Sequence, residues 1–219
     1  MSKATPKGLP ASLDEAYQKV VEKYGGGGII TIKSKTFLFH KPTKTQRHNM
    51  GVDLLNATES TRQNIYRAVA RDLVLPEQRA DLSRLIEVKS SLPDDEKVNR
   101  RRIASDIINR LTGWFGGDLP IEPVYSEKPT DDVSLRVGEV ELIFRLPSEE
   151  QMEEFIRNTS RGQLYASSNR LTSQCVKDSS SLSKLIEAEG PMLIGRLAYV
   201  LMEKYGETKG ESGVSFTGF

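Results

Sequence analysis

The side chains that most often carry catalysis or bind metals are few and far apart in this sequence. His40 and His48 are the only histidines, in different predicted elements, and Cys175 is the only cysteine. A zinc site uses three or four His, Cys or carboxylate ligands at close spacing, so these residues do not predict one. A nucleophilic cysteine needs a neighbouring base, whereas Cys175 follows Leu171 by four residues, as on the buried face of a helix. We therefore predict a non-enzymatic protein without a cofactor.

Four glutamates, Glu149, Glu150, Glu153 and Glu154, form a dense acidic cluster. Carboxylates at this density can hold a cation. They also fall in the first turns of a predicted helix, where the helix dipole and solvent stabilise negative charge. We expect the second role, a solvated helix start, and no metal site.

Four consecutive glycines, 25–28, follow a predicted helix. A phosphate-binding loop ends in Gly-Lys-Ser or Gly-Lys-Thr, because the lysine and the hydroxyl reach phosphate and metal. No such ending follows Gly28. We predict that the glycines end the helix and form a flexible hinge.

Basic residues gather in two places. Lys35, Lys41, Lys44 and Arg47 surround the first predicted hairpin, and residues 100–102 are three arginines in a row. Nucleic-acid binding needs such a density of cations, but it also uses interleaved aromatic residues, which are missing here. We expect a solvated face that offers Lys41, Lys44 and Arg47 to a protein partner, and nucleic-acid binding stays the alternative.

The elements that position these residues begin with a β-hairpin and a capped helix. Residues 29–33 and 36–40 are β-prone runs on either side of a short turn. Pro42 ends the second run because proline cannot donate to a β-ladder. Thr43 and Gln46 then have the spacing of a capping box, which predicts the start of a helix.

The same order of elements recurs about a hundred residues later. Residues 133–137 and 140–145 form a second predicted hairpin, Pro147 ends it, and Ser148 and Gln151 form a second capping box. The sequence FHKPT, which starts at Phe39, aligns with FRLPS, which starts at Phe144, at an offset of 105 residues.

Two nearly identical six-residue sequences, LSRLIE (82–87) and LSKLIE (182–187), extend the correspondence. Their apolar residues follow the i, i+3, i+4 spacing of a buried helix stripe. In the next predicted helix, four apolar positions correspond at a constant offset of 90, namely Ile103, Ile107, Leu111 and Phe115 with Leu193, Leu197, Leu201 and Tyr205. Such preserved elements around a loop of variable length indicate a tandem duplication.

The predicted fold is mostly α-helical with small β-hairpins, of the α+β class, in two tandem copies of a hairpin-plus-helices unit. The tail has two isolated aromatic residues, Phe216 and Phe219, which would dock on a partner if the tail is not simply disordered. The predicted parts are a helical leader with a glycine-rich hinge (1–28), a first repeat unit (29–117), a linker (118–130), a second repeat unit (131–207) and a flexible tail (208–219).

Charge is divided unevenly along the 219 residues, although the net charge is only +1. Residues 1–117 hold 20 Lys and Arg against 13 Asp and Glu, or +7, and residues 118–219 hold 11 against 17, or −6. This asymmetry fits intramolecular attraction, head-to-tail self-association, an acidic partner, or ordinary drift of surface charge. The single cysteine fits a reducing compartment, and no run of apolar residues predicts a membrane span or a secretory signal.

The combined pattern resembles the tail assembly chaperones of long-tailed bacteriophages. Members often have a strand that enters an R-x-P-T/S helix start, a Leu-rich helix with C-V, a Leu-Leu-Glu-like segment, a proline and a final amphipathic helix that ends near a glycine. Residues 36–116 carry this pattern loosely and residues 140–206 carry it best, through Phe144, Pro147, Ser148, Cys175, Val176, Leu182, Leu185, Glu187, Pro191 and Gly206.

The resemblance implies a non-enzymatic role in the cytoplasm of the host cell. Such chaperones coat the hydrophobic tape-measure protein, keep it soluble, recruit tail-tube subunits and leave before the virion is complete. A duplicated unit would offer two sites on one chain to a repetitive client. The alternatives are a structural or adaptor component of a phage particle and, in another class, a nucleic-acid-binding protein with a basic patch.

Overall fold

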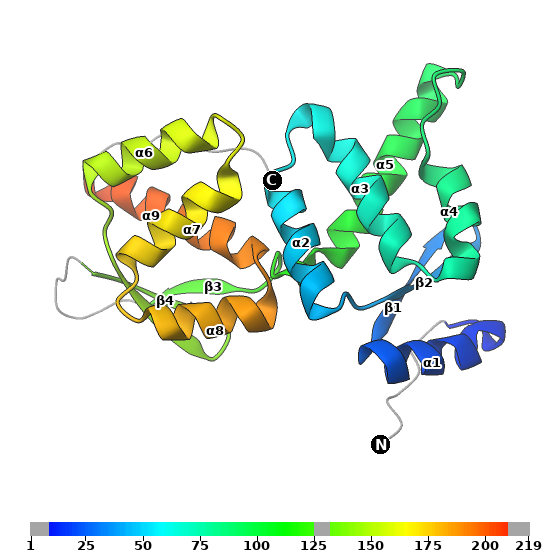
Figure 1. The fold of residues 1–219 in the computed structure, drawn as a ribbon, viewed down its shortest axis with the longest axis horizontal. Helices are drawn as coiled ribbons and strands as arrows, with labels where there is room; N and C mark the ends of the chain where they lie inside the picture. Colours follow the sequence, from blue (N-terminus) through cyan, green and yellow to red (C-terminus); the bar gives the residue numbers. More distant parts are fainter. Residues whose placement is uncertain (1–8, 125–131, 210–219) are drawn as a thin grey trace. The chain divides into compact units, whose positions relative to one another are not determined.

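The structure, a computed structural model, describes residues 9–124 and 132–209 (Figure 1). It is an α+β fold, as predicted, with helices around two small antiparallel sheets. The chain divides into two compact units. Unit 1 comprises residues 1–50 and 57–114, and unit 2 comprises residues 51–56 and 115–219.

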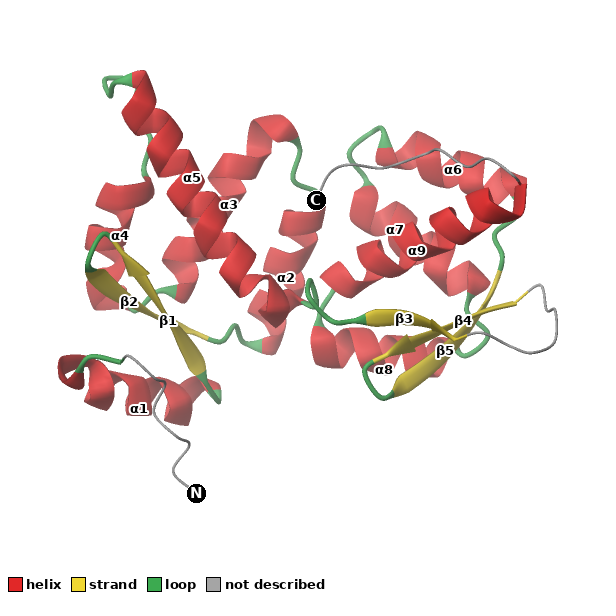
Figure 2. Ribbon diagram, turned by 180° about the vertical axis from the view of Figure 1, so that it is seen from behind, coloured by secondary structure: helices red, strands yellow, loops and turns green. Residues whose placement is uncertain are grey.

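Unit 1 combines a β-hairpin with helices on both of its faces. A first helix lies beside the hairpin (Figure 2), and the remaining helices follow the hairpin in the sequence. Its elements are η1 (Ala11–Leu13), α1 (Asp14–Tyr24), β1 (Gly27–Ile32), β2 (Lys35–His40), α2 (Lys44–Leu55), α3 (Glu59–Leu73), η2 (Pro76–Gln78), α4 (Arg79–Ile86), α5 (Asp94–Leu111) and η3 (Thr112–Phe115), of which α2 and η3 end with residues that belong to unit 2.

In its described residues, unit 2 has a three-stranded sheet in the order β3-β4-β5, followed by four helices. Leu135, Leu142 and Phe144 of this sheet are buried in one core with apolar residues of all four helices. The elements are β3 (Ile121–Val124), β4 (Asp132–Val137), β5 (Val140–Arg145), α6 (Glu149–Thr159), α7 (Leu164–Cys175), α8 (Ser179–Glu189) and α9 (Met192–Lys209).

Both predicted capping boxes are present. The Thr43 backbone N–H donates to the Gln46 side chain at 3.0 Å, and the Gln46 N–H donates back to the Thr43 hydroxyl at 3.3 Å. The pair Ser148 and Gln151 makes the same two bonds at 2.8 and 3.3 Å. These bonds satisfy N–H groups that the first helical turn leaves without partners, so they fix where α2 and α6 begin.

In both units the chain that leaves the second helix after the hairpin returns to the hairpin. Phe39 forms an antiparallel bridge with Val74, and Phe144 forms one with Val176. Both phenylalanines have no exposed surface. The two units therefore share their order of elements and this bridge, which fits a duplication, although the duplication itself stays a prediction.

The aligned residues His40 and Arg145 also occupy corresponding environments. His40 Nε2 lies 3.2 Å from the carbonyl oxygen of Asp72, in the last turn of α3. The Arg145 guanidinium donates to the carbonyl oxygen of Gln174, in the last turn of α7, at 2.9 Å. Each side chain belongs to the last residue of its strand and contacts a carbonyl near a helix C-terminus, where such groups lack helical partners.

The prediction of a flexible glycine hinge is wrong for Gly27 and Gly28. Gly25 ends α1 in a left-handed conformation (φ 72°), as expected of a helix-ending glycine. However, Gly27 and Gly28 belong to β1 and pair with His40 and Phe39. A Cβ atom on Gly27 would lie 2.5 Å from the Phe39 carbonyl oxygen and 2.7 Å from Val20 Cγ1. Glycine therefore permits the close approach of α1 to the hairpin.

The predicted leader and linker both contribute elements to the folded units. Tyr17 and Val20 of α1 are buried with Leu38 and Leu75, so the leader contributes to the core of unit 1. The linker contains β3, in which Pro123 pairs opposite Leu135 of β4. Proline is tolerated there because β3 is an edge strand, whose one neighbour among the described strands is β4. Residues 125–131 and most of the predicted tail lie outside the described ranges.

The two six-residue sequences lie in helices, as predicted, the first in α4 with Glu87 just after its end and the second in α8, but their burial differs. Leu82 and Ile86 have no exposed surface, whereas Leu85 is half-buried. In α8, Leu182 and Leu185 are buried and Ile186 is half-buried. The shared letters therefore mark packing helices, each with its own buried face.

Candidate functional site

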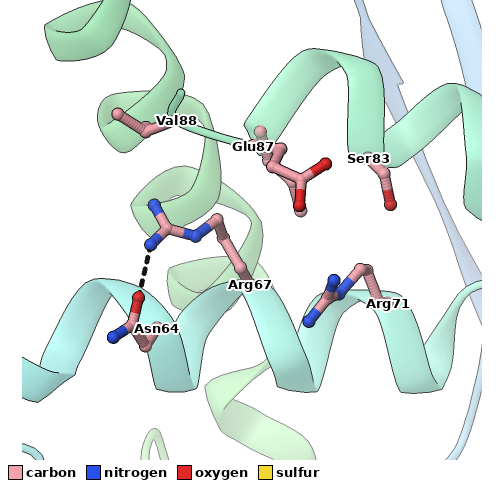
Figure 3. Close-up of a pocket in the computed structure, with 7 residues that line it drawn as sticks. Asn64, Arg67, Arg71, Ser83, Glu87 and Val88 are labelled. Atoms are coloured by element: carbon pink, nitrogen blue, oxygen red, sulfur yellow. Dashed lines mark hydrogen bonds between the residues drawn. The ribbon is translucent and has the colours of Figure 1, made fainter. Parts of the chain in front are cut away.

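A pocket lined by charged and polar side chains lies in unit 1, between α3 and the end of α4 (Figure 3). It has a volume of about 260 Å³ and is open to solvent. Its lining is mostly polar and consists of Asn64, Arg67, Arg71, Ser83, Ile86, Glu87 and Val88.

Helical spacing brings the pocket residues together. Asn64, Arg67 and Arg71 are three and four residues apart on α3, so their side chains lie along one face of that helix. Ile86, without exposed surface, anchors the last turn of α4. Glu87 follows directly as the residue that ends α4.

The charge in the pocket is unbalanced. The Arg67 guanidinium donates to the Asn64 side-chain oxygen at 2.6 Å. Burial lowers the pKa of Arg67, and the positive charges of Arg101 and Arg71 lower it further, while Glu87 acts in the opposite direction. Among the residues that the structure describes, Arg67 and Arg71 form no ion pair with a carboxylate. The pocket therefore holds neighbouring cations that an anion would stabilise.

The predicted run of three arginines is divided by the geometry of α5. Arg100 pairs with Glu96 and donates to the carbonyl oxygen of Glu87 at 2.9 Å. The charge of Arg101 acts on Arg67, and Arg102 donates to Asn99 at 3.1 Å. Consecutive helix residues point about 100° apart, so the run does not form one basic patch.

The predicted partner-binding residues lie outside this pocket. Lys41 follows β2, and Lys44 and Arg47 lie in the first turns of α2. Lys41 and Lys44 are exposed and Arg47 is half-buried. Lys35 lies at the other end of β2 and pairs with Asp81 at 3.4 Å, so it does not join them.

The predicted tail contacts, Phe216 and Phe219, fall outside the described residues. Sequence reasoning did not identify the pocket. The spacing of Asn64, Arg67 and Arg71 places them on one face of a helix, and this could be read from the sequence. The spacing does not show that the end of α4 lies across from them.

A second surface of interest is the outer face of the sheet in unit 2. In β2 of unit 1, Leu38 has no exposed surface because it packs with Tyr17 and Val20 of α1. The residue at the corresponding position of β5 is Ile143, which is 40% exposed. Backbone bonds support the correspondence, since Leu75 donates to the Leu38 carbonyl and Lys177 donates to the Ile143 carbonyl, at 3.0 and 2.8 Å.

His40 and Glu154, two residues of types that can carry chemistry, are engaged in contacts within the fold. His40 is buried, with its ring stacked on Tyr24 at a centroid distance of 4.0 Å. Glu154 of the acidic cluster pairs with Arg170. Within the described ranges, no group of three or more His, Cys, Asp or Glu side chains is placed to hold a metal ion.

Cys175 is buried, as predicted, and burial raises the pKa of its thiol despite the opposing charge of Arg145. The unfolded chain therefore loses the thiol proton at a lower pH than the folded chain does, so this group's contribution to stability is lost as the pH rises above about 9. We expect Cys175→Ala to reduce the alkaline fall in the free energy of unfolding, measured by urea unfolding at neutral and alkaline pH. An identical fall in both proteins would contradict this assignment.

Comparisons with protein-family models, with curated proteins and with solved structures gave no match to this chain. None of the described helices is both long enough and apolar enough to cross a membrane.

Proposed function

We propose that the protein is a non-enzymatic assembly chaperone that binds a helix of its client on the outer face of the unit 2 sheet. The observation that carries this proposal is the difference between Leu38 and Ile143. The same face of the hairpin is covered by an amphipathic helix in unit 1 and is open at Ile143 in unit 2.

Unit 1 supplies the example of how such a face holds a helix. Tyr17 and Val20 stand three residues apart on α1 and are 7% and 3% exposed where they pack with Leu38 and Leu75. Only this stripe of α1 is fully buried, while most of its charged residues are exposed. A client helix with the same spacing of apolar residues would meet Ile143 in the way that α1 meets Leu38.

The face in unit 2 favours weaker binding than the face in unit 1. Lys177 corresponds to Leu75, is exposed, and pairs with Asp132 at 2.5 Å. Ile143 is therefore the main apolar contact, and covering its remaining exposed surface would contribute only about 1 kcal/mol. Weak binding at each site suits a chaperone that must coat a long client and later leave it.

The resemblance to tail assembly chaperones of long-tailed phages names the client class. Its best-matching segment includes Phe144, Pro147 and Ser148, which follow Ile143 and lead into α6. We propose that the client is the tape-measure protein, that the complex recruits tail-tube subunits in the host cytoplasm, and that the chaperone leaves before the virion is complete.

Co-expression with the tape-measure protein tests the proposal. Wild-type protein is expected to keep the client in the soluble fraction, and Ile143→Asp is expected to lose most of this effect because it places a charge at the contact. The control is Ile156→Asp on α6 of the same unit, where the side chain is 57% exposed. Equal solubility with both variants would contradict the proposed surface.

Composition of purified particles separates the chaperone from a structural or adaptor component. Mass spectrometry of intact virions is expected to find no copies of this protein. A fixed number of copies per particle would support the adaptor role and overturn the proposal that the protein leaves.

A further inference from the structure

We propose that the pocket between α3 and α4 binds a carboxylate group, presented by an acidic segment of a protein partner. The pocket lies in unit 1 and uses charge, whereas the proposed client site lies in unit 2 and uses an apolar contact. The two inferences are therefore independent and can fail separately.

The first reason is the charge of the site. Arg67 and Arg71 line the pocket, and Arg101 of α5 is close enough to act on Arg67. Glu87 is the one acidic residue in the lining. Arg67 is half-buried and Arg71 is exposed. Neighbouring cations repel one another, most strongly where burial desolvates one of them, and an entering anion removes that repulsion. The repulsion between the arginines therefore favours the binding of an anionic ligand.

The second reason is the set of donors. Guanidinium groups present paired N–H donors whose geometry matches the two oxygens of a carboxylate. Ser83 adds a hydroxyl and Asn64 adds an amide to the same lining. Figure 3 shows Arg67 and Arg71 on α3, across the pocket from Ser83 and Glu87, with the Arg67 guanidinium turned toward Asn64.

The size and surroundings favour a single side chain over a nucleic acid. A volume of about 260 Å³ admits a small group and offers no track for a sugar-phosphate backbone. Two other cations of α5 are already paired, Lys97 with Asp94 at 2.9 Å and Arg100 with Glu96. In addition, Glu87 would repel a phosphate more strongly than a singly charged carboxylate.

The site is specific to unit 1. With the bridge residues Val74 and Val176 in register, the positions of Arg67 and Arg71 correspond to Asn169 and Ser173 of α7. Neither carries a charge, so the shared arrangement of helices does not require arginines here. We infer that the arginines serve binding and not packing.

Fluorescence anisotropy with a labelled peptide of alternating Glu and Ser tests the site. We expect wild-type protein to bind it, and Arg67→Gln to weaken binding about tenfold or more, as loss of a charge-assisted hydrogen bond predicts. The matched control is Arg102→Gln, which removes the same charge from another arginine that donates to an Asn three residues earlier. Equal loss in both variants would show only general charge attraction and would overturn the site.

Three further measurements complete the test. The Gln–Ser version of the peptide is expected not to bind, and a single-stranded oligonucleotide is expected to bind more weakly than the acidic peptide. Tighter, Arg67-dependent oligonucleotide binding would overturn the carboxylate assignment in favour of nucleic acid. Light-scattering detection of self-association that Arg67→Gln abolishes would identify a second copy of this chain as the source of the carboxylate.

Hydrogen exchange on the wild-type chain keeps the proposal testable if Arg67→Gln folds poorly. Bound acidic peptide is expected to slow exchange in residues 64–71 and 83–88 more than in α5 beyond Arg102. Protection that is uniform along unit 1, or none at saturating peptide, would contradict a site in this pocket.

Discussion

Replacing Phe39 by alanine is expected to lower the free energy of unfolding of unit 1 by about 3–5 kcal/mol, the cost of deleting a fully buried aromatic ring. Phe39 has no exposed surface, and its backbone forms the bridge to Val74. The ring therefore packs where the hairpin meets the chain that leaves α3. Its loss would leave a cavity at the junction on which the order of elements depends.

Native-state hydrogen exchange in β2 and α3 measures this effect without requiring the whole chain to unfold in one step. The control is Val98→Ala on α5, because that side chain is 62% exposed and its truncation should cost less than about 0.5 kcal/mol. A loss of under about 1 kcal/mol for Phe39→Ala would contradict the packing described for the hairpin.

The second large effect is expected for Gly27→Ala, which should destabilise unit 1 by about 2–3 kcal/mol. The new Cβ would overlap the Phe39 carbonyl oxygen and a methyl group of Val20, so either α1 or the hairpin must move. Thermal unfolding compares it with Gly28→Ala, whose Cβ would meet Trp114 at 3.4 Å, an ordinary contact. Equal tolerance of both changes would show that residues 25–28 are a flexible joint after all.

Local signals in the sequence predicted the local structure well. The hairpins and the two capping boxes depend on residues close together in the chain, such as Thr43 and Gln46, so spacing alone reveals them. The strand β3 was missed because Pro123 and its polar neighbours read as linker, and only pairing with β4 makes them a strand. The strand role of Gly27 was missed because it depends on Val20 and Phe39, which approach from other elements.

The candidate sites were harder to predict than the fold. The density of cations drew attention to Lys41, Lys44 and Arg47, which are close in sequence. The pocket instead combines Arg67 with Glu87, twenty residues apart, through the packing of α4 beside α3. Likewise, alternation in β5 predicts that Ile143 points away from Phe144, but only α1 in unit 1 shows what can cover that face.

The two units share their order of elements and differ in surface. The proposed function rests on this difference. Unit 1 covers its hairpin with α1 and presents an arginine pocket, while unit 2 leaves Ile143 exposed beside the ion pair of Lys177 and Asp132. The two proposed sites would therefore give one chain an apolar contact and a charged contact on separate units. A client that engages both would be held more tightly than either contact alone allows.

The most direct test of the central claim is site-specific photo-crosslinking in cells that also make the tape-measure protein. A photoreactive amino acid placed at Ile143 is expected to crosslink to the client, and the same group placed at Ile156, which is more exposed in the same unit, is expected not to. Crosslinking of the client at Ile156 and not at Ile143, or at neither position in a soluble complex, would contradict the account.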